Sequence, residues 1–290
     1  MAKWSGKTKG NVLGYRIFIT TIKLFGIDLA YFILNFVSFY FYLFLGNQRK
    51  ILANFYAHRV GVKKHLIQKT IRNNFIQIGH SIIDKIAFSV NRASQITYRD
   101  SGEDYLRELA NNKQGAFLIS AHVGNWDIAG NLLNGINANV SVVMYQNEYE
   151  KIQTLLSSQK KEASFSIISI SDDLSHLVKI YAAIKRGDLV CMHADRYLDG
   201  AKTELIDFFG KPAKFPSGPF QMIEKLKAPY SFVFAIKEEK YKYYFTASKP
   251  SFQTNKKARE IAVEFVTLLE KKVRDYPEQW FNYYDFYSTN

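Results

Sequence analysis

Apolar and polar positions follow two patterns along the chain. Short apolar segments between glycines or polar turns are typical of buried strands, whereas apolar residues three or four positions apart are typical of helices. Strands are predicted over residues 115–121, 140–145, 165–169, 188–193, 203–209, 230–236 and 242–248, the last two antiparallel to each other. Helices are predicted over residues 47–92, 101–112, 125–133, 148–161, 174–186, 219–227 and 258–274. This alternation predicts an α/β fold in which helices flank a mostly parallel central sheet.

The N-terminal segment is apolar over a greater length. Residues 29–46 (LAYFILNFVSFYFYLFLG) form a run of 18 residues without a charge, close to the roughly 20 residues that a membrane-spanning helix needs. Tyr and Phe are frequent in this run, as they are at membrane interfaces. We expect a membrane-associated helix here, with a helix buried in a globular core as the alternative. Because basic residues flank the run on both sides, the sequence does not separate a spanning helix from one that lies in the interface.

The charge is concentrated in the same part of the chain. The net charge is +13, and residues 1–100 carry +12 of it, from 15 Lys or Arg and three acids. A basic surface binds nucleic acid, anionic lipid or an acidic protein. The adjoining apolar run favours lipid, and no nucleic-acid recognition pattern is present, so we expect a membrane and no nucleic acid as partner. The single cysteine, Cys191, excludes a disulfide framework and a cysteine-based zinc site.

One candidate site follows the strand predicted over residues 115–121. His122 lies just past that strand, Gly124 permits a tight turn, and Asp127 falls in the first turn of the next helix. A carboxylate bonded to one imidazole nitrogen fixes the tautomer and leaves the other nitrogen free to accept a proton. A pair of His122 and Asp127 would therefore suit the deprotonation of an external hydroxyl or amine. The alternative is a structural histidine in a turn and an aspartate that stabilises the helix dipole.

A second polar cluster follows the strand predicted over residues 188–193. It contains His193, Asp195 and Arg196, and a loop at residues 208–219 comes soon after. The bases of this region are Arg196, Lys202, Lys211 and Lys214. Such a set suits a phosphate-bearing ligand, with a basic surface loop as the alternative. We expect no metal, because the histidines and acids lack the spacing of metal ligands.

These residues resemble a known family. The segment from His122 to Asp127 resembles the His-x-x-x-x-Asp/Glu motif of the lysophospholipid acyltransferase superfamily, and Gly124-Asn125-Trp126 resembles its branch of lipid A late acyltransferases, the lauroyl and myristoyl transferases. The resemblance continues, in the family's order, at Asp195, at residues 208–213, at Gly218 and at residues 276–280. The segments at residues 4–6 and 279–286 look more like an offshoot found with aryl-polyene or flexirubin-type pigment lipids.

The resemblance implies transfer of a fatty acyl group from a thioester, on acyl carrier protein or coenzyme A, to a hydroxyl or amine of a lipid acceptor. His122 would be the general base and Asp127 the carboxylate that orients it, with no cofactor and no covalent acyl-enzyme. Asp195, with Arg196 and the basic loop, would bind a phosphate of the acceptor or donor. The expected substrate-binding residues are Asn125, Trp126, Asp195, Arg196, Lys211, Lys214 and Gly218.

We expect residues 1–48 to form the membrane-associated segment and residues 49–290 the acyltransferase domain. Without a secretory signal at its start, the protein is expected at the cytoplasmic face of a bacterial inner membrane. The expected acceptor is a lipid A-like glycolipid or a related bacterial lipid; the alternatives are a pigment or aminolipid. A hydrolase would need a Gly-x-Ser-x-Gly elbow, which is not found. A non-catalytic basic protein of the membrane surface is the other rival, in which His122 and Asp127 are dispensable.

Overall fold

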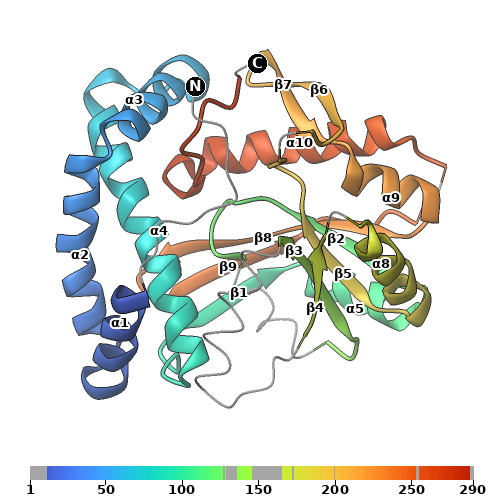
Figure 1. The fold of residues 1–290 in the computed structure, drawn as a ribbon, viewed down its shortest axis with the longest axis horizontal. Helices are drawn as coiled ribbons and strands as arrows, with labels where there is room; N and C mark the ends of the chain where they lie inside the picture. Colours follow the sequence, from blue (N-terminus) through green and yellow to red (C-terminus); the bar gives the residue numbers. More distant parts are fainter. Residues whose placement is uncertain are drawn as a thin grey trace.

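A seven-stranded sheet forms the centre of the protein in the computed structural model, which describes residues 12–126, 128, 136–145, 165–171, 173–198, 200–252 and 255–287 (Figure 1). The strand order is β1-β9-β8-β2-β5-β3-β4. Neighbouring strands pair in parallel, apart from the antiparallel pair of β8 and β9. The predicted α/β fold with a mostly parallel sheet flanked by helices is confirmed, as is the antiparallel pairing of its last two strands.

The strands of the large sheet are β1 (Thr97–Ser101), β2 (Ala116–Ser120), β3 (Val140–Tyr145), β4 (Ser166–Ile170), β5 (Leu189–His193), β8 (Tyr230–Glu239) and β9 (Lys242–Ala247). A separate antiparallel pair consists of β6 (Thr203–Phe208) and β7 (Lys211–Pro216). The helices are α1 (Val12–Phe25), α2 (Ile27–Phe44), α3 (Gly46–Phe55), α4 (Ile67–Ser89), α5 (Glu103–Asn111), α8 (Ser175–Arg186), α9 (Gly218–Leu226) and α10 (Ala258–Asp275).

Strand β2 lies inside the sheet, and all of its residues are buried. Its side chains alternate between two hydrophobic clusters, as the two-residue period of a strand requires. Phe117 and Ile119 join the cluster that contains residues of α4, α8, α9 and α10, whereas Leu118 joins the cluster that contains residues of α5. A strand covered on both faces reads as a continuous apolar run, which explains why this one was predictable.

The helical segment predicted over residues 47–92 is interrupted. Helix α3 ends at Phe55, and a π-helical turn (Tyr56–Val60) and a 3-10 turn (Lys64–Leu66) precede α4. Gly61 between the turns has a φ of 78°, in the left-handed region that glycine adopts without a steric cost. The segment predicted as helical over residues 47–92 therefore forms two α-helices, with a break at Gly61 that the apolar spacing did not show.

Two strands differ from the predictions as well. Residues 208–219 were predicted as a loop, but Lys211–Pro216 form β7, which pairs with β6 across a turn at Phe209 and Gly210. Strand β1 was not predicted, because all five of its residues are exposed and carry no apolar pattern. The helix predicted over residues 148–161 lies outside the described residues. Of the helix predicted over residues 125–133, Trp126 and Ile128 are helical, whereas residues 127 and 129–133 lie outside the described residues.

Candidate functional site

The register of two neighbouring strands brings the two polar clusters of the sequence together. Ser120 at the end of β2 pairs with His193 at the end of β5, and the amide of Ala194 donates to the carbonyl of Ser120 at 2.9 Å. His122 and Asp195 each lie two residues beyond these paired positions. They therefore meet at the carboxyl ends of parallel strands, where open α/β sheets hold their ligands.

Asp195 holds His122 with both carboxylate oxygens. The imidazole Nδ1 of His122 lies 2.8 Å from Oδ1 of Asp195, and the backbone N–H of His122 donates to Oδ2 at 3.0 Å. The side chain of His122 is 7% exposed and that of Asp195 only 1%. Within the described ranges, no residue forms a hydrogen bond with Nε2 of His122. Because a carboxylate only accepts hydrogen bonds, Nδ1 of His122 carries a proton, and in the uncharged form of the ring Nε2 is the nitrogen that can accept one.

The electrostatic surroundings keep this carboxyl ionised. Burial alone raises the pKa of Asp195, but the electrostatic attraction of His122, the hydrogen bond from its imidazole and the charge of Arg196 outweigh burial. The pKa of Asp195 therefore lies well below its usual range. Arg196 provides a nearby positive charge, with Nε 4.0 Å from Oδ2 of Asp195, and its guanidinium donates to the carbonyl of Phe281.

Aromatic rings cover the imidazole of His122. Its ring centroid lies 4.7 Å from that of Trp126, edge to face, and 4.4 Å from that of His193. Burial is the main cause that lowers the pKa of His193 to about 3, so this neighbour is neutral near pH 7. The base candidate therefore lies between a carboxylate on one side and uncharged rings on the other.

Backbone contacts fix the loop that carries His122. Gly124 has a φ of 70°, and a Cβ at this position would lie 2.0 Å from the carbonyl oxygen of Ala235. Its N–H donates to the carbonyl of Gln279 at 2.9 Å, and the N–H of Phe281 donates to the carbonyl of His122 at 3.0 Å. The C-terminal segment was not singled out for this role, because no local sequence pattern shows which loop a distant segment will contact.

Asn125 points into the protein. Its N–H donates to the carbonyl of Ala235 at 2.7 Å, and its side-chain Nδ2 donates to the hydroxyl of Tyr243 at 3.0 Å and to the carbonyl of Ser81 at 3.3 Å. The residue is 1% exposed. The N–H groups of Gly124 and Asn125 thus already have acceptors within the fold.

The predicted site residues fall into two groups. The structure brings His122, Trp126, Asp195 and Arg196 together, with Asn125 anchored in the same loop. Asp127 lies outside the described residues.

The remaining three predicted substrate-binding residues belong to other elements of the fold. Lys211 and Lys214 belong to β7, and Gly218 begins α9. The ammonium group of Lys211 lies 5.6 Å from the ring centroid of Tyr287. Among the described residues, no hydrogen bond, ion pair or ring contact connects these three with His122, so their role in binding substrate stays a prediction.

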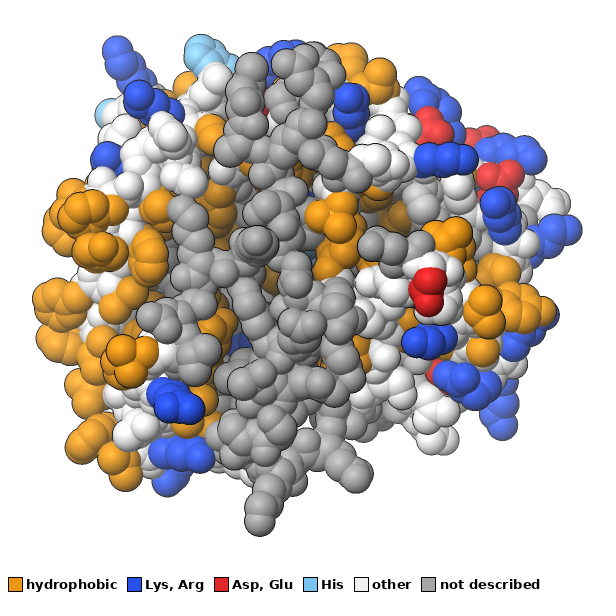
Figure 2. All heavy atoms as spheres, in the orientation of Figure 1, with side chains coloured by type: hydrophobic (Ala, Val, Ile, Leu, Met, Phe, Trp, Pro, Cys, Tyr) orange, Lys and Arg blue, Asp and Glu red, His pale blue; other side chains and the backbone are white. Residues whose placement is uncertain are grey.

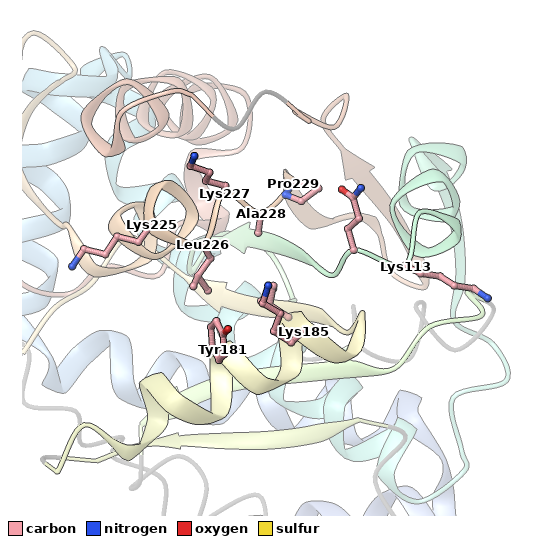
Figure 3. A pocket seen from close by; sticks show the side chains of 10 residues that line it. Lys113, Tyr181, Lys185, Lys225, Leu226, Lys227, Ala228 and Pro229 are labelled. Carbon is pink, nitrogen blue, oxygen red and sulfur yellow. The ribbon is translucent and has the colours of Figure 1, made fainter.

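A surface cavity of about 460 Å³ lies at the opposite end of the sheet. It is lined by residues at the start of β2 and β8 and at the end of α8 and α9, including Lys113, Lys185, Lys225 and Lys227. Figure 3 shows the side chains of Lys113 and Lys225 pointing away from each other. Because the cavity lies at the start of β2, whereas His122 lies beyond the end of this strand, the cavity is separate from the site at His122. Among the described residues, no group of three or more His, Cys, Asp or Glu has a metal-binding arrangement.

Comparison with known protein families shows to which family the chain belongs. The chain matches the family described as bacterial lipid A biosynthesis acyltransferase over residues 9–284, and it belongs to this family. The predicted resemblance and the assignment to the acyltransferases are thereby confirmed.

Individual relatives are more distant. Proteins named phosphatidylinositol mannoside acyltransferase, from two strains of Mycobacterium tuberculosis, are each 26% identical to the chain over 131 residues. That match covers 45% of this chain and 41% of each relative. The chain thus matches about two fifths of the length of these relatives.

Proposed function

We propose that the protein transfers a fatty acyl group from an acyl thioester to a hydroxyl or amine of a membrane lipid, with His122 as the general base. The observation that carries the proposal is the hydrogen bond from Nδ1 of His122 to the buried Asp195, together with an Nε2 to which no described residue is hydrogen-bonded. Membership in an acyltransferase family supports the same reaction.

The reaction follows from the state of the imidazole. Nε2 of His122 accepts the proton of the acceptor hydroxyl while its oxygen forms a bond to the thioester carbonyl carbon. The tetrahedral intermediate collapses, the carbon–sulfur bond breaks, and the imidazolium returns its proton to the leaving thiolate. A base in this position contributes typically about 10²- to 10⁴-fold to the rate. No acyl-enzyme forms, and the products are the acylated lipid and a free thiol.

Asp195 is proposed as the positioning residue of this base. It holds the tautomer, and its negative charge stabilises the imidazolium that forms during the reaction. Both of its oxygens are bonded to His122 and it is buried, so we assign it this role in place of the phosphate-binding role that the resemblance implied. The predicted role of Asp127 as a carboxylate that orients His122 stays a prediction, and Arg196, close to the same loop, stays a predicted phosphate ligand.

The proposed acceptor is a lipid A-like glycolipid or a related bacterial membrane lipid. The name of the relatives from M. tuberculosis supports a glycolipid acceptor. Helix α2, by length and composition a candidate for membrane association, would keep the enzyme close to such a lipid. The proposed location is the cytoplasmic face of the bacterial inner membrane, where acyl carrier protein and acyl coenzyme A are both available as donors.

Product analysis tests the proposal. The purified protein is incubated with bacterial membrane lipids and with either acyl carrier protein or coenzyme A carrying the same acyl chain, and lipid masses are measured. The proposal predicts a lipid heavier by one acyl group and release of one thiol per lipid. Thiol release at the same rate without any lipid would indicate a hydrolase and contradict the proposal. Lipid analysis of a deletion strain then identifies the acceptor by the species that disappears.

A further inference from the structure

We infer that α2 lies in the plane of a lipid bilayer, embedded along its outer face, and does not cross the bilayer. This inference goes beyond the proposed reaction and does not depend on it. The length and hydropathy of α2 fit both arrangements, since it is the one helix of the described chain that could span a membrane. Its contacts with the rest of the protein separate the two.

The inner face of α2 is fastened to α4 over most of its length. Ala30 and Leu34 are buried, and Gly79 of α4 provides the space for Leu34, because a Cβ on Gly79 would lie 2.6 Å from Cδ1 of Leu34. Farther along, the hydroxyl of Ser38 donates to the carbonyl of Phe75 at 3.3 Å, and that of Tyr42 donates to Oε1 of Gln68 at 3.0 Å. Figure 1 shows the two helices side by side at one end of the sheet.

A buried polar network strengthens this attachment. The hydroxyl of Tyr31 on α2 donates to the carboxylate of Asp84 on α4, which also accepts from Lys237 on β8 and Tyr243 on β9. Asp84 is completely buried. Removal of α2 from this position would take a hydrogen-bond donor from a buried charge, which costs considerably more than the loss of an exposed contact.

The outer face of α2 is mostly apolar; its exposed polar residues are Asp28, near the start of the helix, and Asn35. Its exposed large hydrophobic residues are Leu29, Phe32, Phe36, Phe39, Tyr40, Leu43 and Phe44, and α1 adds Leu13, Ile17, Leu24 and Phe25. Figure 2 shows hydrophobic side chains gathered along the margin where Figure 1 places α2. A row of this length is unusual on the surface of a monomer and marks an interaction site.

The surrounding charges select lipid as the occupant. Exposed Arg16, Lys23 and Lys50 lie on α1 and α3, the helices that precede and follow α2 in the chain. Asp28, the acid within α2, is paired with Lys240. An apolar face bordered by bases fits the interface of an anionic bilayer, where a helix inserts its apolar side by about 5–10 Å.

A spanning arrangement conflicts with α4. Because α2 is attached to α4 along its inner face, α4 would have to enter the bilayer together with it. Exposed Lys69 and Arg72 on α4 would then lie in hydrocarbon, where charged side chains are strongly disfavoured. An in-plane helix leaves α4 and the sheet in water and places the apolar row in lipid.

Depth measurements test the inference. In a Cys191→Ser background, single cysteines replace Phe32, Phe36 or Tyr40 and carry a fluorophore, on vesicles of phosphatidylcholine and phosphatidylglycerol with quenchers at known depths. The in-plane helix predicts nearly equal, shallow depths. A spanning helix, with a rise of about 1.5 Å per residue, places the positions of Phe32 and Tyr40 about 12 Å apart in depth. A spread close to that value, or labelling from inside the vesicle, overturns the inference.

Binding of unlabelled protein to the same vesicles gives a second test. Phe36→Glu introduces a charge in the middle of the apolar row and is expected to weaken binding at least tenfold. Val178→Glu is the matched control, because Val178 on α8 is 70% exposed and Phe36 is 64% exposed. It is expected to bind within twofold of the unmodified protein. Equal binding of the two variants, or no binding of the unmodified protein, contradicts the inference whatever the outcome of the acyl-transfer assays.

Discussion

The side-chain amide of Asn125 donates a hydrogen bond to the hydroxyl of Tyr243, 3.0 Å away. That hydroxyl in turn donates to Asp84, the buried carboxylate that also holds Lys237 and Tyr31. The loop of His122 is thus connected through two hydrogen bonds to an ion pair shared by α4 and β8. Tyr243 therefore supports both the fold and the position of the candidate base.

Replacement of Tyr243 tests this double role. Tyr243→Phe removes one donor from Asp84 and one acceptor from Asn125, and unsatisfied buried groups of this kind cost about 1–3 kcal/mol each. We expect a lower unfolding free energy and a reduced kcat with KM little changed. Tyr230→Phe is the matched control, because Tyr230 donates to Glu264 at 2.8 Å and has no bond to the His122 loop. An equal loss of kcat in both variants would contradict a positioning role for Tyr243.

The buried ion pair is expected to be sensitive to loss of one partner. Lys237→Met leaves Asp84 charged, buried and without its cation, which typically costs about 3–5 kcal/mol. Lys240→Met removes an exposed pair with Asp28 and is expected to change stability little. Denaturant unfolding of the two variants measures the difference. Similar small changes in both variants would contradict a stabilising role for the buried pair of Lys237 and Asp84.

Acidification is expected to destabilise the protein through His193. Burial lowers the pKa of His193 to about 3, whereas an unfolded histidine titrates near pH 6.5. Between these values the unfolded chain binds a proton that the folded protein does not, so stability falls as the pH drops from 7 to 5. The lowered pKa of Asp195 has its effect only below about pH 4, where an unfolded aspartate becomes protonated.

The variant His193→Gln is expected to lose less stability over this range than the unmodified protein. The measurement is the denaturant midpoint at pH 7 and at pH 5. Exposed His65→Gln serves as the surface control. An identical pH dependence in His193→Gln and the unmodified protein would exclude His193 as the group responsible.

Loss of the charge on Asp195 is expected to slow the reaction. Asp195→Asn keeps the size of the side chain but no longer holds the same tautomer or stabilises the imidazolium. We expect kcat to fall by at least about 10²-fold, with a smaller change in KM. Asp188→Asn is the matched control, because Asp188 is also buried and directly precedes β5, at the end of the sheet away from His122. Full activity in Asp195→Asn would contradict the proposed role of Asp195 in positioning His122.

The sequence predicted the central strands because their burial leaves a continuous apolar run. It did not predict β1, which is exposed, nor β7, where Lys211 and Pro212 are more typical of a loop. It also placed His122 and Asp195 after strands without showing that they meet. Their contact depends on the pairing of Ser120 with His193, and a pattern of buried residues alone does not show which positions of two strands lie opposite each other.

Acyl transfer by the His122→Ala variant tests whether His122 is the general base of the reaction. The purified variant is compared with His65→Ala, which removes an exposed histidine, in the same thioester-to-lipid assay after circular dichroism shows both to be folded. Loss of the base predicts a fall in turnover of about 10²- to 10⁴-fold for His122→Ala and unchanged turnover for His65→Ala. Turnover of folded His122→Ala at the rate of the unmodified protein would contradict the role of His122 as the general base.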